Sequence, residues 1–294
     1  RYVLMNISQD NLELDMNKLS IADKWILNEL NETVKLVREN LDNYRIGEVA
    51  NILYDFFRNK YCDWYVELSK IEKNEAVLVY VLENFLKLLH PIMPHITERV
   101  WQLIPKVSKQ LGDDELKSAI IVSNFPIYRK ELEFSKEAQQ MELVFETITS
   151  LRNVRQSFNI SPSVKCNIEI RAEKSEKPIF EAIESYIQRL ARVENISYAD
   201  MDAAVPPKSA AAVVSASKII VPLADLIDLE AETARQKKKL DKLLNEKNSL
   251  SGRINNPKFV ENAPQELIAQ TKERIAEIEI QEKAINDLIN SLNA

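Results

Sequence analysis

Residues 61–68 read Y-C-D-W-Y-V-E-L, and residues 88–101 read L-L-H-P-I-M-P-H-I-T-E-R-V-W. Both stretches place aromatic and aliphatic side chains at helical spacing. Pro91 ends one helix and Pro94 begins the next, because proline cannot continue a helix but is accepted in its first turn. The same spacing extends over residues 1–134. It predicts a mainly α protein that begins with an antiparallel helical bundle.

The bundle is expected to contain four helices. Ser20 and Asp23 form a capping box, in which each side chain bonds the backbone of the other residue. The apolar pattern predicts helices from Ser20 to about Leu41, from about Arg45 to Leu68, from about Ile71 to just before Pro91 and from Pro94 to Leu103. Residues 105–134 lack such a pattern, and we expect an irregular segment that crosses back over the bundle.

Residues 135–225 change character and predict a small α+β junction module. Residues 164–171 read V-K-C-N-I-E-I-R, which alternates apolar and polar side chains as a half-buried strand does. Helices are expected around Ile148 and Ile183. Three shorter strands are expected at residues 196–198, 212–214 and 219–221.

Residues 226–294 carry apolar or tolerated residues at alternating steps of three and four, from Leu226 to Ile254 and again from Ile268 to Leu292. Two such arms around a turn predict an antiparallel coiled-coil hairpin. Asn255, Asn256 and Pro257 suit its tip, and Pro264 suits the start of the return helix. Each arm of about 28 residues is about 40 Å long.

The charges of this hairpin are unevenly shared. The return arm is mostly acidic, whereas the outgoing arm and tip carry Arg235, Lys237, Lys238, Lys239, Lys242, Lys247, Arg253 and Lys258. One interpretation is pairing between the helices together with a solvated face. The other is a basic stripe that follows a phosphate backbone. Both can hold, because cations that are not paired across the hairpin remain available.

Composition excludes several classes of function. Only three glycines occur, so no glycine-rich loop can hold a nucleotide phosphate. Cys62 and Cys166 are too far apart in sequence for a zinc motif, and His90 and His95 belong to no catalytic pattern. We therefore expect no metal site and no catalytic residue. The net charge of −6 argues against nucleic-acid binding, although net charge says little about a local patch. No run is apolar enough to span a membrane, and we expect a cytoplasmic protein.

Several motifs resemble those of class I aminoacyl-tRNA synthetases for valine, isoleucine and leucine. They are the two opening stretches, R-Y-V-L at residues 1–4, and L-S-I-A-D-K-W-I-L at residues 19–27. The ending is similar to that of the valyl-tRNA synthetase family, with V-P-L-A-D-L-I-D-L-E-A-E at residues 221–232 and P-K-F-V-E-N-A-P at residues 257–264. The isoleucyl enzymes commonly end in a cysteine-rich zinc module, which has no counterpart here. The resemblance covers essentially all 294 residues.

The resemblance implies a tRNA-binding region that works inside a larger ligase. The family's adenylating domain, which uses ATP, and its editing domain have no counterpart in this chain. Residues 1–134 would read the anticodon, with Arg1, Lys24 and Trp25 as the implied contacts, and residues 226–294 would hold the tRNA body through the eight cations named above. The implied partner is valine tRNA rather than DNA, and the implied state is a monomer.

Alternatives remain at this point. Trp25 has an equally good explanation as a core residue beside Ile26, and Lys24 cannot make the planar two-pronged contact of an arginine. The chain could belong to an isoleucyl or leucyl enzyme. It could also be a helical scaffold whose coiled coil binds another protein.

Overall fold

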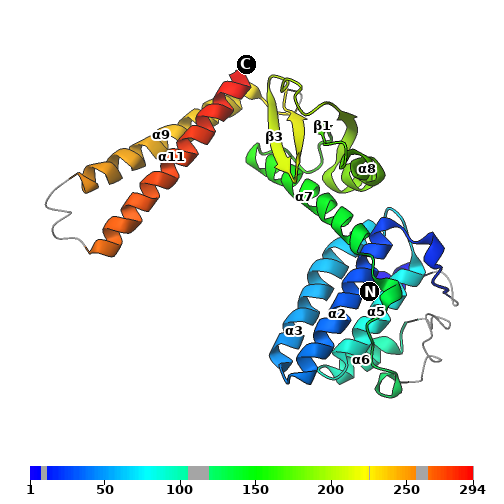
Figure 1. The fold of residues 1–294 in the computed structure, drawn as a ribbon. Coiled ribbons are helices and arrows are strands. Elements are labelled where there is room, and N and C mark those ends of the chain that lie inside the picture. The colour runs from blue at the N-terminus through cyan, green and yellow to red at the C-terminus, as the bar shows by residue number, and fades with distance from the viewer. Residues whose placement is uncertain (8–11, 105–118, 225, 256–263, 294) are drawn as a thin grey trace. The chain divides into compact units, whose positions relative to one another are not determined.

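The computed structural model describes residues 1–7, 12–104, 119–224, 226–255 and 264–293 (Figure 1). The chain forms two compact units, Arg1–Phe145 and Glu146–Ala294, and each is described by itself. The mainly helical fold is confirmed, with a small mixed sheet and a C-terminal helix pair. The boundaries of the three predicted regions, 1–134, 135–225 and 226–294, stay a prediction.

The first unit is the predicted helical bundle. Its helices are α1 (Tyr2–Asn6), α2 (Ile21–Asp42), α3 (Ile46–Asp55), α4 (Val66–Leu68), α5 (Glu75–Leu89), α6 (Pro94–Trp101) and the first part of α7 (Ser135–Ser157). A π-helical segment, Phe56–Tyr65, joins α3 to α4 without a break. Helix α5 begins later than the predicted Ile71, because the side chain of Asn74 accepts a hydrogen bond from the Val77 amide and so starts the helix there.

A buried carboxylate joins three parts of the bundle. Asp23 and Ser20 form the predicted capping box at the start of α2. The Tyr65 hydroxyl, at the end of the π-helical segment, donates to Asp23 Oδ1 at 2.6 Å, and Asn74, just before α5, donates to Asp23 Oδ2 at 3.0 Å. Burial raises the pKa of Asp23, and these hydrogen bonds oppose that shift.

Residues 119–134 run from α6, where the Ile120 amide donates to Glu98, back along α2, where Arg38 donates to the Pro126 carbonyl. This path agrees with the crossing predicted for the irregular segment; residues 105–118 lie outside the described ranges. Asn31 exchanges two hydrogen bonds with the backbone of Arg129, each 2.8 Å long. Asn28 accepts from the Phe134 amide at 3.0 Å. The segment includes two short 3₁₀ helices, Ile120–Val122 and Lys130–Leu132. Side-chain amides on one face of α2 satisfy its backbone groups at Arg129 and Phe134.

The second unit contains a four-stranded sheet in the order β2-β1-β4-β3 (Figure 1). Its strands are β1 (Cys166–Arg171), β2 (Val193–Tyr198), β3 (Ser209–Val214) and β4 (Ser217–Pro222), and α8 (Lys177–Ala191) connects β1 to β2. The crossover makes β1 and β2 parallel, whereas β1–β4 and β3–β4 are antiparallel. Arg155 ties the last turns of α7 to this sheet, because its guanidinium donates to the carbonyls of Val164 and Arg192 at 2.8 and 3.0 Å.

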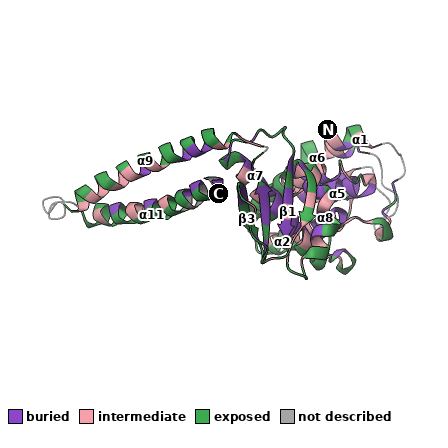
Figure 2. Cartoon of the chain, turned by 90° about the horizontal axis from the view of Figure 1, so that it is seen from above, coloured by how far each residue is buried: buried purple, intermediate pink, exposed green. Residues whose placement is uncertain are grey.

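The C-terminal hairpin consists of α9 (Leu229–Ile254) and α11 (Gln265–Asn293). The two helices bury Leu243, Ile278, Ile285 and Ile289 against each other, with Leu240 and Leu250 at the edge of this core. Exposed residues run along the whole length of both helices (Figure 2). Leu226, predicted as the first core position, lies before the helix, since the Asp228 side chain caps α9 by accepting from the amides of Glu230 and Ala231.

We expect Asn31→Ala to lower the free energy of unfolding of the first unit by about 2 kcal/mol, because two backbone groups of Arg129 lose their partner. Tryptophan fluorescence in urea measures this selectively, since Trp25, Trp64 and Trp101 all lie in that unit. Asn40→Ala is the matched control on the same helix. The side chain of Asn40 is half-buried and donates to the Leu36 carbonyl of its own helix, so its loss should cost less than about 0.5 kcal/mol. Equal losses in both variants would contradict the role given to Asn31.

Candidate nucleic-acid interface

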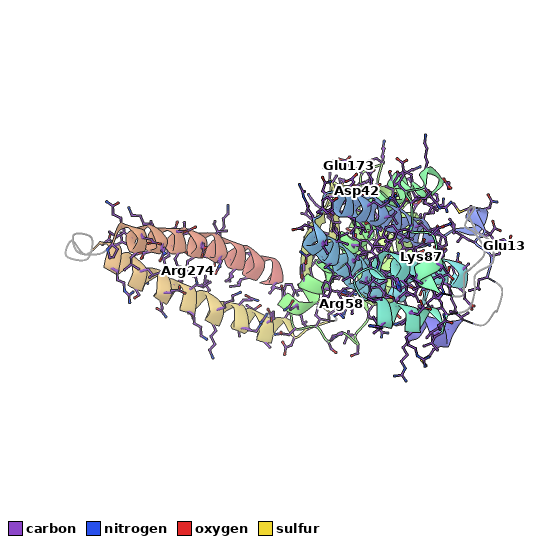
Figure 3. All side chains as sticks on the ribbon, turned by 90° about the horizontal axis from the view of Figure 1, so that it is seen from below. Glu13, Asp42, Arg58, Lys87, Glu173 and Arg274 are labelled. Atoms are coloured by element: carbon purple, nitrogen blue, oxygen red, sulfur yellow. The ribbon has the colours of Figure 1, made fainter. Side chains whose placement is uncertain are left out.

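Some of the cations on the hairpin are used to hold its two helices together. Lys247 on α9 lies between Glu279 and Glu282 on α11, with its Nζ at 3.2 and 3.0 Å from their carboxylates. Arg274 on α11, labelled in Figure 3, donates to Glu246 on α9 at 2.9 Å and to Glu277 at 3.0 Å. These pairs confirm that cross-hairpin pairing occurs, so Lys247 already has two acidic partners.

Arg235 also has partners within the protein. Its guanidinium forms two hydrogen bonds of 2.7 Å with the carboxylate of Glu232, which lies one turn earlier on α9. It also donates to the backbone carbonyl of Ser157, the last residue of α7. The hydrogen bonds to Glu232 raise the pKa of Arg235, and the charge of this guanidinium is therefore already balanced within the protein.

The remaining described cations of α9 are Lys237, Lys238, Lys239, Lys242 and Arg253, and all five are exposed. Within the described part of the chain, no ion pair joins any of them to an acid. At about 100° per residue, four of them fall on one side of the helix, and Lys237 falls on the other. We call this side the cationic flank; it consists of Lys238, Lys239, Lys242 and Arg253.

The cationic flank contains a single acid among the described residues of α9 between Lys239 and Arg253. Glu246 lies seven residues after Lys239 and seven before Arg253, so it shares their side of the helix. Its charge is balanced by Arg274, which donates to both of its carboxylate oxygens. The flank therefore presents positive charge along α9. Lys258, the eighth predicted cation, lies outside the described residues.

The two anticodon candidates at the start of α2 are engaged within the bundle. Lys24 is half-buried, forms an ion pair of 3.0 Å with Glu137, and lies 5.8 Å from the centre of the Phe134 ring. Trp25 is 4% exposed and packs edge-on against Phe145, with 4.9 Å between ring centres. Burial of this kind supports a packing role for Trp25. Its contact with RNA stays a prediction.

Arg1, the third candidate, is exposed and borders a cavity of about 530 Å³. The cavity lies between α1, the π-helical segment, α5 and α6, and most of its lining is apolar. Phe57 and Phe85 stack in its wall with ring centres 4.3 Å apart. Lys24 and Trp25 do not line it. The structure thus separates Arg1 from the other two candidates rather than bringing the three together.

The helical spacing of residues 61–68 predicts core packing for Tyr61, and no predicted site includes Phe57 or Phe85. Tyr61 is indeed buried, with its hydroxyl donating to the Leu78 carbonyl at 2.7 Å. Its ring also borders the cavity with Phe57 and Phe85. Helical spacing could not reveal this, because it does not show where neighbouring helices leave a gap.

Two family models match parts of the chain. A family model described as the anticodon-binding domain of tRNA ligase matches residues 23–170. A second, described as the valyl tRNA synthetase tRNA binding arm, matches residues 228–293. The chain belongs to the valyl-tRNA synthetase family. Within that family it corresponds to the C-terminal anticodon-binding domain and the tRNA-binding arm.

Individual relatives agree with this placement. The valine–tRNA ligase of Legionella pneumophila (strain Lens) is 35% identical over 295 residues, which cover 95% of this chain and 31% of the relative. That of Listeria innocua is 36% identical over 299 residues, 96% of this chain and 32% of the relative. The valine–tRNA ligase of Enterococcus faecalis is 33% identical over 307 residues, which cover 100% of this chain and 34% of the relative. The chain spans about a third of the length of the curated relatives it matches.

The valyl assignment removes the isoleucyl and leucyl alternatives, and the two family descriptions favour tRNA over a protein-binding scaffold. No helix among the described residues is long and apolar enough to cross a membrane. Within the same residues, no group of three or more His, Cys, Asp or Glu side chains is placed to hold a metal ion.

The arm of this valyl-tRNA synthetase relative should lose stability in acid. Arg274 holds the pKa of Glu246 below its ordinary value of 4.5. A carboxylate whose pKa is lower in the folded state stabilises the fold fully above its unfolded-state pKa of 4.5. This stabilisation is lost as the pH falls through the folded-state pKa. We expect Glu246→Gln to speed hydrogen exchange in α9 and α11 at pH 6, and to have a smaller effect at pH 3, where protonation weakens the bond to Arg274. Glu273→Gln, which alters an exposed neighbour of Arg274, is the control. An effect of Glu246→Gln that is equal at both pH values would rule out this linkage.

Proposed function

We propose that this chain binds valine tRNA through two surfaces, one on the bundle and one on the arm. The bundle reads the anticodon, and the cationic flank of α9 contacts the phosphate backbone of the tRNA body. The observation that carries the proposal is the division of the arm's cations. Lys247, Arg235 and Arg274 have acidic partners, whereas the exposed cations of the flank have none among the described residues.

Such a flank suits phosphate contacts for electrostatic reasons. RNA carries a regular row of negative charges with condensed counterions, and cations that replace those counterions gain affinity from their release. A lysine already held between two carboxylates gains less, because its own partners must be given up. The paired cations keep the rod stiff, and the unpaired cations supply attraction that does not depend on base sequence.

Anticodon reading needs contacts of another kind. Unpaired bases are recognised by stacking on aromatic or guanidinium planes and by hydrogen bonds to their edges. We assign Arg1 the leading role among the three candidates, because it is exposed and stands beside a cavity with aromatic walls. Trp25 and Lys24 then act indirectly, by fixing α2 against α7 through Phe145 and Glu137.

For the whole protein, we propose the reaction that the names of its relatives state, the ligation of valine to tRNA. We propose further that this reaction uses ATP. This chain would contribute to that reaction by position alone. Holding two distant parts of the tRNA orients the acceptor end for a catalytic site elsewhere and removes part of the entropic barrier. We also propose that the protein is a monomer, that it lies in the cytoplasm and that it does not bind DNA.

We expect the triple variant Lys238→Glu, Lys239→Glu and Lys242→Glu to weaken binding of a valine tRNA transcript. The slope of log K against log salt should become shallower by about 0.9 for each phosphate that the variant no longer neutralises. Filter binding between 50 and roughly 200 mM salt gives both quantities.

The control makes the same change of charge on the opposite side of the hairpin, with Lys237→Glu, Lys272→Glu and Lys283→Glu. These lysines are exposed, and helical geometry places them away from the flank. The control should retain most of the slope of the unaltered chain. Equal losses in the two triple variants would mean that net charge, rather than the flank, governs binding.

We also expect the 294-residue chain to bind a valine tRNA transcript more tightly than one with a changed anticodon. The difference should persist at high salt, because base recognition depends on stacking and hydrogen bonds rather than on released counterions. Arg1→Ala should reduce the difference and leave the salt slope nearly unchanged. Equal affinity for both transcripts at every salt concentration would leave the arm as the sole contact and refute anticodon reading by this chain.

A further inference from the structure

The root of the arm contains a small network of polar side chains that are largely withdrawn from water. Glu232 and Gln236, one turn apart on α9, are each 6% exposed. Glu232 accepts two hydrogen bonds from Arg235 and one from Gln236, all of 2.7 Å. A carboxylate that is buried to this extent is costly unless it is fully bonded, and here three hydrogen bonds satisfy it.

Arg235 connects this network to helix α7. Its Nη2 donates to the carbonyl of Ser157 at 2.5 Å. That carbonyl ends α7, and the last carbonyls of a helix have no partner within it and lie at the negative end of its dipole. A planar guanidinium held on one side by Glu232 can approach such a carbonyl in only a narrow range of directions.

The end of α7 is itself fixed to the sheet. Arg155, two residues before Ser157, donates to the carbonyls of Val164 and Arg192, which flank β1 and β2. Arg155 is 8% exposed. The backbone at the end of α7 therefore links two sets of hydrogen bonds, those of Arg155 to the sheet and that of Ser157 to Arg235 on the arm. Helix α11 packs at the same root, against β3.

We propose that Arg235 is a positioning residue, which together with Glu232 fixes the direction in which the arm leaves the sheet module. The inference deepens the tRNA-binding function proposed above and rests on it, because a fixed direction matters only if the cationic flank must meet a particular part of the RNA. It gives Arg235 a different role from that of the exposed lysines, with which the sequence groups it.

Because the arm is long, a small change in its direction at the base causes a large displacement of its tip. Helix α9 has 26 residues and is therefore about 39 Å long, so that a tilt of about 10° at its base moves its tip by about 7 Å. A displacement of that size takes lysine side chains away from the phosphates they would bind. We call the contact of Arg235 with Glu232 and the Ser157 carbonyl the clamp. Without the clamp, the flank could still reach the same phosphates, but the arm would sample a wider range of directions. The entropic cost of binding tRNA would therefore rise.

The first test needs no RNA. Spin labels are attached at Asn248→Cys on the arm and Lys218→Cys on β4, which are both exposed positions. Cys62 is replaced by serine, and the buried Cys166 is left in place. Pulsed electron paramagnetic resonance then reports the distance between the arm and the sheet. We expect Arg235→Gln and Glu232→Gln each to broaden the distance distribution at least about twofold while circular dichroism stays unchanged. Lys239→Gln, which removes an exposed charge of the flank, should leave it narrow. Unchanged widths in both clamp variants would overturn the proposal.

The second test separates positioning from charge. Glu232→Gln removes a negative charge, so that charge alone predicts tighter binding of a valine tRNA transcript. Positioning predicts roughly three- to tenfold weaker binding, with the salt slope preserved because the same phosphates are still neutralised. Tighter binding by Glu232→Gln would show that Arg235 acts as a phosphate contact. Failure of the unaltered chain to bind tRNA would count against the proposed function, whereas the distance measurement would still decide whether the clamp exists.

Discussion

The arrangement of the bundle depends on how the carboxylate of Asp23 is satisfied. It is 2% exposed, and an uncompensated charge at that depth would cost several kcal/mol. The backbone of Ser20 and the side chains of Tyr65 and Asn74 compensate it, and these groups come from the start of α2, the end of the π-helical segment and the start of α5. The three elements are thus fixed at one point. The same helix α2 carries Asn28 and Asn31, whose amides bind the backbone of Phe134 and Arg129.

The hairpin shows how one residue type can serve two purposes. An amphipathic helix pair with a short apolar core gains little from burial, and its cross-hairpin pairs at Lys247 and Arg274 add modest stability because they are solvated. Their greater effect is on shape, since they keep two long helices side by side. The exposed cations of the flank then act from a stiff support. Flexible cations would pay more entropy to reach the same phosphates.

Much of the fold followed from periodicity. The capping box at Ser20, the strand at residues 166–171, the crossover helix and both arms of the hairpin were predicted because each is encoded by neighbours within a few residues. The late start of α5 and the exclusion of Leu226 from α9 were missed, since single capping side chains, Asn74 and Asp228, decided both ends. Of the candidate site, the sequence supplied the cations of the arm and Arg1, but treated all eight cations alike.

The sequence by itself determined the helical class, the first strand of the sheet, the hairpin and, through the motifs of the family, binding to tRNA. Those properties depend on local spacing and on residue types, which a linear pattern contains. Tertiary structure decided which of the described cations have acidic partners, that Trp25 is buried against Phe145, and that Arg235 faces the end of α7. The physical reason is that the electrostatic role of a charge depends on its nearest partner in space, and the Ser157 carbonyl that Arg235 meets lies 78 residues away in the chain.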